Sequence, residues 1–233
     1  QQAEKRYAMN KIYVVLVFSL LILACKSKVL EKKIVEQKVE FNQKLSDELK
    51  KMERVDQIAA YIPKGEYAKM SEKEWNSFKD SVFTTHQKRV AEIFNEFGFV
   101  GYDLVGKDGS DNFWVIVQHS DHAPKFQETV LDAMKLEVDK GNATPEYYGF
   151  LVDRVRINGG KEQVYGTQFD YNEFGQAFPK QMTDTTGVND RRISLGLTPM
   201  VKRMNEMTLS HFNMNKAYFA AKGITEAKLY KTD

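Results

Sequence analysis

The segment His119-Ser120-Asp121-His122 places two imidazoles and one carboxylate within four residues. Side chains of these types bind metal ions or transfer protons. A catalytic zinc ion needs three protein ligands and an open position. The remaining histidines, His86 and His211, each fall on an apolar helical stripe, where a histidine is typically a hydrogen-bonded residue at the edge of the core. The single cysteine, Cys25, cannot supply a cysteine-based site. We therefore expect no metal ion and no other cofactor.

His119 is the better candidate for acid–base chemistry. On a helix it shares a face with Val115 and Ile116, so its imidazole should point toward the protein interior. A buried imidazole is costly unless it is hydrogen-bonded, so it needs a partner. One interpretation makes His119 a general base oriented by the carboxylate of Asp153. The other makes it a buried polar bridge between two helices. The sequence leaves both open.

The segment 163–168 is rich in hydrogen-bonding side chains, and its alternation is typical of a strand. Gly166 lies within it, where the missing side chain lets a ligand or another backbone approach closely. One interpretation is a pocket for a small anionic ligand, because arginines recognise anions well. The residues assigned to this pocket are Gln118, Arg154, Gln163, Tyr165, Gly166, Thr167, Gln168, Arg191 and Arg192. The other interpretation is a hairpin that Arg–Asp pairs and amide hydrogen bonds fasten to helices.

The N-terminal part of the sequence has the pattern of an export signal. Thirteen uncharged residues, Ile12–Ala24, follow a basic stretch and precede Cys25. As a helix this run would span roughly 20 Å, short of the ~30 Å hydrocarbon core of a membrane, so it fits a signal peptide. The residues Ile22-Leu23-Ala24-Cys25 resemble a bacterial lipobox, which implies that Cys25 is diacylated and becomes the new N-terminus. The alternative is a plain signal peptide or signal anchor with an incidental cysteine.

The composition excludes several classes of protein. Apolar residues make up 42% and aromatic residues 12% of the 233, which argues against a disordered chain. From position 25 onward, 31 basic residues balance 31 acidic ones. Such a neutral chain is a poor candidate for binding nucleic acid, which relies on the release of counterions by basic side chains. We therefore expect no nucleic-acid partner.

Helical periodicity begins soon after the cysteine. The segment 26–60 is charge-dense but repeats apolar residues at helical spacing. We expect a helix that leaves the membrane as a solvated stalk, 25–48, and then docks on a single domain, 49–233. The apolar positions of this helix are Leu30, Ile34, Phe41, Leu45, Leu49, Met52 and Ala59.

Further helices follow, separated by glycine and proline. A capping box, Ser71 with Glu74, predicts the start of a long helix that ends at Gly98. A loop with three glycines comes next, and Phe113–Val117 leads into His119. The sequence predicts three later helices, at 124–140, 145–158 and 199–222. Between the last two, the alternation from Gln163 to Phe169 and a turn at 170–175 predict a β-hairpin. The fold class is therefore mainly α, with a small β-hairpin inserted between helices.

Five short motifs occur in order along the mature chain. They are Asp56-Gln57, Gln118-His119-Ser120-Asp121 with Phe126-Gln127, Asp153-Arg154-Val155, Gln163–Gln168, and Val188-Asn189 with Arg191-Arg192 and Leu195-Gly196-Leu197. Together they resemble an uncharacterised bacterial domain family, one described only as a domain of unknown function, from about Leu49 to about Met200. The resemblance implies a shared fold and a shared pocket, and it supplies no activity.

The sequence thus predicts a lipid-anchored protein of the cell envelope that faces the periplasm and binds a small polar or anionic ligand in one pocket. A hydrolase that uses His119 and Asp153 as an acid–base pair is the first alternative. The second is a structural lipoprotein that docks an unidentified protein partner through the 26–60 helix.

Overall fold

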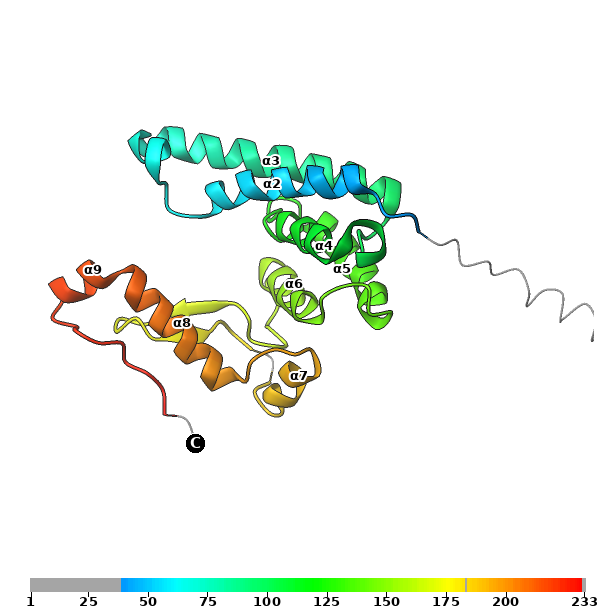
Figure 1. The fold of residues 1–233 in the computed structure, drawn as a ribbon. Helices are drawn as coiled ribbons and strands as arrows, with labels where there is room; N and C mark the ends of the chain where they lie inside the picture. Colours follow the sequence, from blue (N-terminus) through cyan, green and yellow to red (C-terminus); the bar gives the residue numbers. More distant parts are fainter. Residues whose placement is uncertain (1–38, 183, 232–233) are drawn as a thin grey trace, which may run out of the picture. The chain divides into compact units, whose positions relative to one another are not determined.

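The computed structural model describes residues 39–182 and 184–231 (Figure 1). The described part is mainly helical with one two-stranded antiparallel sheet, which confirms the predicted fold class. The described residues from Glu40 onward form one compact unit. Cys25, residues 1–24 and most of the predicted stalk lie outside the described residues. The elements are α2 (Gln43–Ala60), η2 (Gly65–Lys69), α3 (Glu72–Phe97), α4 (Tyr102–Gln118), α5 (Pro124–Asp139), α6 (Pro145–Asn158), β1 (Phe169–Tyr171), β2 (Ala177–Pro179), α7 (Val188–Ser194), α8 (Met200–Met214) and α9 (Lys216–Ala221).

Helix α2 is part of the core from its first turn. It begins at Gln43, and the side chain of Asn42 caps it by accepting a hydrogen bond from Leu45 N at 3.0 Å. Leu45 and Leu49 are both buried in the main hydrophobic cluster. The core therefore already includes residues at the end of the predicted stalk.

Helices α2 and α3 lie side by side above α4 (Figure 1). The predicted capping box at the start of α3 is confirmed, since Ser71 and Glu74 each bond the other's backbone N–H. Gly98, with φ 73°, ends the helix as predicted. The main cluster fills the space among α2, α3, α4, α5 and α6.

The predicted glycine-bearing loop is instead the first half of α4. Gly106 has φ 73° and ψ 171°, a conformation that favours glycine, and it kinks the helix. Gly109 lets α4 approach α2 closely, because a Cβ at this position would collide with Val105 and touch Ser46. The three glycines favour a loop in the sequence, but in the structure Gly106 forms a kink within α4 and Gly109 allows a close contact between α4 and α2.

The prediction of a strand over 163–169 is also wrong for all residues before Phe169. Strand β1 begins only at Phe169 and pairs with β2, with Phe169 opposite Pro179. Residues 164–168 form a loop, preceded by an isolated parallel bridge between Gln163 and Met182. The alternation of polar side chains here reflects a loop held by side chains, described below, and not a sheet edge.

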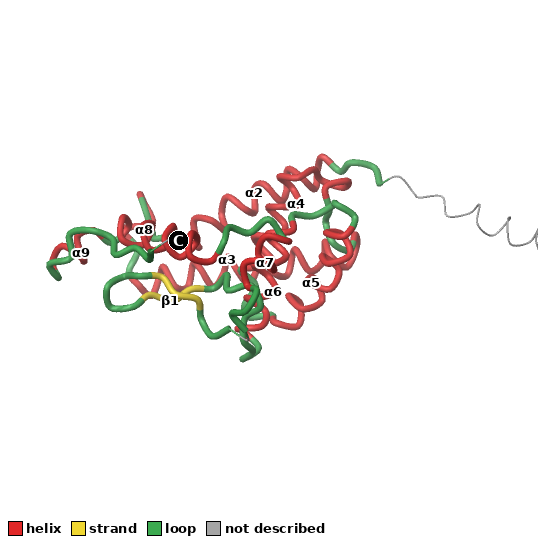
Figure 2. Tube along the Cα trace, turned by 90° about the horizontal axis from the view of Figure 1, so that it is seen from below, coloured by secondary structure: helices red, strands yellow, loops and turns green. Residues whose placement is uncertain are grey.

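The predicted last helix is divided in two. Asn215 separates α8 from α9, and its side-chain amide donates a hydrogen bond to the carbonyl of His211. Helix α8 packs against β2, and Figure 2 shows the strands beside this helix. The short helix α7 was not predicted. None of the helices in the described residues is both long and apolar enough to cross a membrane.

Candidate functional site

His119 caps the C-terminal end of α4 and bonds a carboxylate from a different helix. Its Nδ1 lies 2.5 Å from Oδ2 of Asp56, which comes from the buried face of α2. Asp56 is 0% exposed, whereas the His119 side chain is 17% exposed. The ring of His119 also lies against Phe83, with 5.5 Å between the ring centroids. The orienting carboxylate of His119 is therefore Asp56.

Asp153, the partner expected from the sequence, has a different role. Its Oδ1 accepts hydrogen bonds from the backbone N–H groups of Val164 and Tyr165, at 2.8 and 3.1 Å. Its Oδ2 accepts one from Thr167 N at 2.8 Å. The predicted His119–Asp153 pair is wrong, because all of these bonds of Asp153 go to the loop that follows α6.

A second histidine approaches the same carboxylate. Nδ1 of His86, from α3, lies 3.8 Å from Oδ1 of Asp56. Both atoms are buried, and neither has a hydrogen-bond partner among the described residues. A buried polar atom without a partner is costly, and such atoms concentrate at functional sites. We refer to Asp56, His86 and His119 as the histidine–carboxylate cluster.

The charge state of this cluster follows from its contacts. Burial raises the pKa of Asp56, but the hydrogen bond from His119 and the proximity of His86 outweigh burial and hold that pKa below its ordinary value of 3.8. Asp56 is therefore ionised at neutral pH and can only accept hydrogen bonds. Nδ1 of His119 must then carry the hydrogen, which leaves Nε2 as the proton acceptor of the neutral ring. This is the arrangement of an oriented general base.

The cluster does not have the form of a metal site. Nδ1 of His119 is occupied by Asp56, and no three His, Cys, Asp or Glu residues in the described part of the chain are arranged to hold a metal ion.

The turn after His119 is fixed by an ion pair. Arg154 Nε and Nη2 donate to the two oxygens of Asp121 at 2.8 and 2.6 Å. Asn158 adds a third bond to the same carboxylate. The sequence assigns Arg154 to a ligand pocket with the 163–168 segment, but its guanidinium bonds Asp121 instead. Burial raises the pKa of Asp121, but the hydrogen bonds from Arg154, Asn158 and Gln127 and the charge of Arg154 together outweigh burial and bring that pKa below its ordinary value. Gln127 completes the turn by donating to the backbone oxygen of Gln118 at 3.1 Å.

Most of the other predicted ligand-binding residues hold the loop 163–168 together. The buried Gln163 bonds both the N–H and the carbonyl of Gln168, at 2.7 and 2.9 Å. Arg191 donates to the carbonyl of Val164, and Arg192 donates to the carbonyls of Tyr165 and Gly166. These bonds favour the interpretation of a fastened segment, with backbone carbonyls as the partners in place of aspartates.

Gly166 and its neighbours in the loop also contact other residues of the protein. Gly166 has φ 63°, and a Cβ there would collide with Met200 and Met182. The close approach that its missing side chain allows is that of methionine side chains. Thr167 bonds the side-chain amide of Gln168, while the ring of Tyr165 lies near Gly149.

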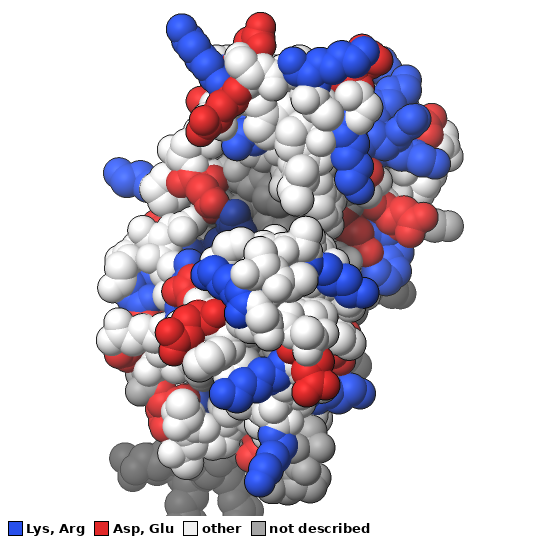
Figure 3. Space-filling model, turned by 90° about the vertical axis from the view of Figure 1, so that its left-hand side faces the viewer, with Lys and Arg blue, Asp and Glu red and all other residues white. Residues whose placement is uncertain are grey.

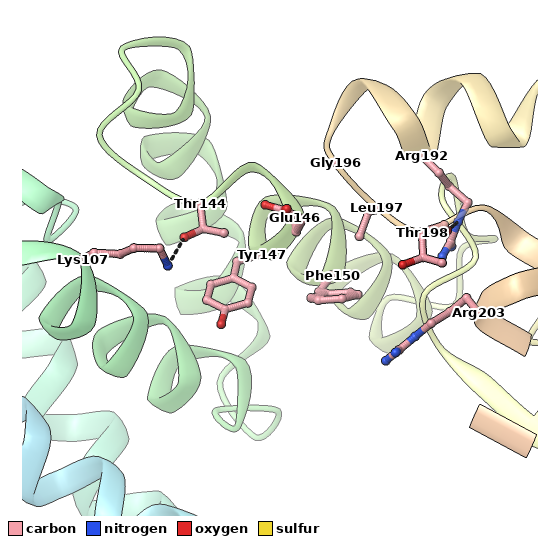
Figure 4. Close-up of a pocket in the computed structure, with 10 residues that line it drawn as sticks. All are labelled: Lys107, Thr144, Glu146, Tyr147, Phe150, Arg192, Gly196, Leu197, Thr198 and Arg203. Atoms are coloured by element: carbon pink, nitrogen blue, oxygen red, sulfur yellow. Dashed lines mark hydrogen bonds between the residues drawn. The ribbon is translucent and has the colours of Figure 1, made fainter. Parts of the chain in front are cut away.

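One predicted residue, Arg192, also lines a cavity of about 430 Å³. We refer to this space as the basic cavity. The residues lining it are Lys107, Thr144, Glu146, Tyr147, Phe150, Arg192, Gly196, Leu197, Thr198 and Arg203. Figure 4 shows Lys107 on one side, Arg192 and Arg203 on the other, and the rings of Tyr147 and Phe150 between them. Lys107 bonds Asp111 and Thr144, at 2.5 and 3.5 Å.

Arg192 is the most unusual charge in the basic cavity. It is 1% exposed, and its hydrogen bonds go to the neutral carbonyls of Tyr165, Gly166 and Thr198. Among the described residues it forms no ion pair. Burial and the charge of Arg203 lower the pKa of Arg192 to about 10, against the smaller opposing effects of acidic groups. A buried cation without an anionic partner is costly.

Sequence reasoning named Asp56 only as part of the Asp56-Gln57 motif, and it missed the role of Asp56 as the partner of His119 and the role of His86 beside it. Asp56 stands at helical spacing between Met52 and Ala59, on the stripe that faces the core. An acidic residue on an apolar stripe must find a buried partner, and this was the available signal. His86 occupies the equivalent position on the stripe of α3.

The residues of the histidine–carboxylate cluster and of the basic cavity all lie in a part of the chain that matches a known family. A profile of a family of unknown function, DUF6624, matches residues 44–210. The chain belongs to this family. The resemblance to an uncharacterised domain family is thereby confirmed, and both the histidine–carboxylate cluster and the basic cavity lie within the matched range. No curated protein and no solved structure matches the chain.

Proposed function

We propose that the protein binds a small anionic ligand in the basic cavity. The observation that carries this proposal is Arg192, a buried guanidinium whose hydrogen-bond partners are all neutral and which shares the cavity with a second cation, Arg203. An anion in the cavity would compensate the charge of Arg192, and Arg203, which already pairs with Glu206 at 3.2 Å, would offer a second cationic contact. Such compensation is strong in a partly desolvated site, where charge-assisted hydrogen bonds are about twice as strong as neutral ones.

The lining of the basic cavity also limits the kind of anion. Its volume lies at the small end of the range for ligand sites, roughly 300–1,000 Å³. Tyr147 offers a ring face that is fixed in place, because it stacks on Trp114 at 4.1 Å between centroids and its carbonyl accepts the indole N–H. Thr144 and Thr198 contribute hydroxyl groups. A small ring or short chain with one carboxylate or phosphate group matches this lining, with the anionic group at Arg192 and Arg203.

A titration with matched variants tests this proposal. The probes are inorganic phosphate, citrate and a nucleoside monophosphate, each measured by calorimetry at low and moderate salt. Arg203→Gln should weaken binding of the preferred anion at least tenfold, while Lys202→Gln, a neighbouring exposed residue outside the lining, should change it less than twofold. Equal effects of the two substitutions, or no anion with a Kd below about 1 mM, would contradict the proposal.

The second candidate function is hydrolysis with His119 as general base, and the observation that favours it is the buried Asp56–His119 hydrogen bond. Asp56 orients the imidazole, and Nε2 of His119 has no hydrogen-bond partner among the described residues. Hydrolysis of 4-nitrophenyl acetate, phosphate and butyrate tests this candidate. We expect a rate that falls at least 100-fold in His119→Gln and persists in His211→Gln. No hydrolysis above the His119→Gln background would exclude these reactions.

We further propose that the protein is attached to the cell envelope through acylated Cys25 and faces the periplasm. The support is the sequence Ile12–Cys25, since this segment lies outside the described residues. Two acyl chains give stable attachment where a single chain is marginal.

A further inference from the structure

A second cavity, of about 500 Å³, lies at the turn between α2 and η2. We refer to it as the turn cavity. The residues lining it are Arg54, Gln57, Ile58, Tyr61, Ile62, Lys64, Gly65 and Tyr67. It shares none of these with the basic cavity. Figure 3 looks onto the end of the molecule where this turn lies.

The turn cavity exposes an unusual amount of apolar surface to water. Tyr61 is 66% exposed, Ile62 is 71% exposed and Ile58 is 39% exposed, although all three lie close together at the end of α2. Single exposed apolar residues are ordinary, but contiguous ones mark binding surfaces. The fourth apolar member, Tyr67, packs against Phe78 with 5.1 Å between ring centroids, so that side of the cavity is fixed.

The charges of the turn cavity are of one sign. Arg54 and Lys64 line it, and no acidic residue does. Neither forms an ion pair among the described residues, unlike Lys69 nearby, which pairs with Glu66 at 2.8 Å. Two unpaired cations beside an apolar surface complement a molecule with an anionic head and an apolar chain.

We propose that the turn cavity binds a single-chain amphiphile with an anionic head group, of the fatty-acid or alkyl-phosphate type. The chain lies over Ile58, Ile62 and Tyr67, and the head group pairs with Arg54 and Lys64. Because the head is held by charge and the chain by apolar contact, affinity depends on both the sign of the head group and the length of the chain. Two additional buried methylene groups should tighten the Kd by about tenfold.

The turn cavity also adjoins the histidine–carboxylate cluster. Gln57 lines the cavity, and its Nε2 lies 3.5 Å from Oδ2 of Asp56, the oxygen that also contacts His119. An amphiphile that moves the Gln57 side chain therefore changes the surroundings of Asp56. The NMR signals of the His119 ring provide a local report of occupancy.

Calorimetry of the full chain with soluble amphiphiles tests the proposal. Octanoate, decanoate and dodecanoate are compared with dodecyltrimethylammonium, all below their critical micelle concentrations. We expect one site per chain, a Kd that tightens with each pair of methylenes, and at least tenfold weaker binding of the cationic amphiphile. The double variant Arg54→Gln/Lys64→Gln should remove the preference for the anionic head.

A matched pair of apolar variants locates the site. Ile62→Gln should weaken dodecanoate binding at least tenfold, whereas Ile193→Gln, an equally polar change at a residue 59% exposed on α7, should not. Both positions are exposed, so both variants should keep the wild-type melting temperature. Equal effects of the two variants, or equal binding of both head groups, would overturn the proposal. So would dimerisation that Ile62→Gln abolishes in a chain that does not bind dodecanoate, because the turn cavity would then be an interface between two copies.

Discussion

Replacing Asp56 with asparagine removes one charge from the centre of the histidine–carboxylate cluster and keeps the shape of the side chain. Asp56 is fully buried, and its oxygen accepts a 2.5 Å hydrogen bond from His119. A hydrogen bond to a charged group contributes about 1.5–3 kcal/mol, and a neutral one about 1 kcal/mol. Because the introduced asparagine retains one acceptor oxygen, we expect Asp56→Asn to lower the free energy of unfolding by about 1–2 kcal/mol at pH 7. For a chain of this size that corresponds to a fall in Tm of about 2–8 °C.

The effect of this substitution should depend on pH in a definite direction. The pKa of Asp56 is lower in the folded protein than its ordinary value of 3.8. Such a group stabilises the fold fully above the unfolded-state pKa, and the stabilisation is lost as the pH falls through the folded-state pKa. The gap between the parent and Asp56→Asn should therefore narrow as the pH falls below about pH 4.

Urea unfolding of both proteins between pH 7 and pH 3 measures this gap. Asp80→Asn is the matched control, because Asp80 is exposed and has no hydrogen-bond or ion-pair partner among the described residues. A gap that stays constant down to pH 3 would refute the argument that the charge of Asp56 stabilises the cluster. A loss at pH 7 within about 0.5 kcal/mol of the Asp80→Asn control would refute it as well.

Two further predictions concern other parts of the chain. Asp153→Asn replaces one carboxylate oxygen with an amide N–H₂ that cannot accept from the backbone donors of the 164–167 loop, so it should lower the free energy of unfolding by about 1–3 kcal/mol, measured by urea titration at pH 7. Unchanged stability would mean that the loop does not depend on this carboxylate. Labelled fatty acid should enter the wild-type protein in bacterial cells and not Cys25→Ser, and equal labelling of both would exclude Cys25 as the acyl acceptor.

The helices that the sequence predicted well are those with local signals at their ends. Helix α3 has its capping box at Ser71 and its terminating glycine at Gly98, and α5 and α6 each begin with proline in the first turn. Such signals act within a few residues, so they can be read without the tertiary structure. The failure at Gly106 has the opposite cause, since the conformation that makes it a kink and not a loop depends on how α4 packs against α2.

The candidate site required contacts between residues distant in sequence. His119 and Asp56 are separated by 63 positions, and the need of His119 for a partner did not say which carboxylate would meet it. Asp153 is a carboxylate within one of the motifs, but its hydrogen bonds go to the loop that follows its own helix. The sequence correctly predicts that His119 and Asp153 are largely buried and hydrogen-bonded. The identity of their partners, however, depends on the tertiary structure.

Most backbone N–H groups of residues 164–168 are hydrogen-bonded, as they would be in a sheet, but their acceptors are side-chain oxygens and not a neighbouring strand. Asp153 accepts from the N–H groups of Val164, Tyr165 and Thr167, and Gln163 accepts from that of Gln168. These amides should therefore exchange with deuterium as slowly as those of a core helix, although no helix or strand contains them. The protection of three of them is tied to one carboxylate, so Asp153→Ala, which removes both acceptor oxygens, should release three amides together, while the sheet and α6 keep theirs. Slow exchange in this segment thus reports on a side chain of α6 and not on the pairing of strands.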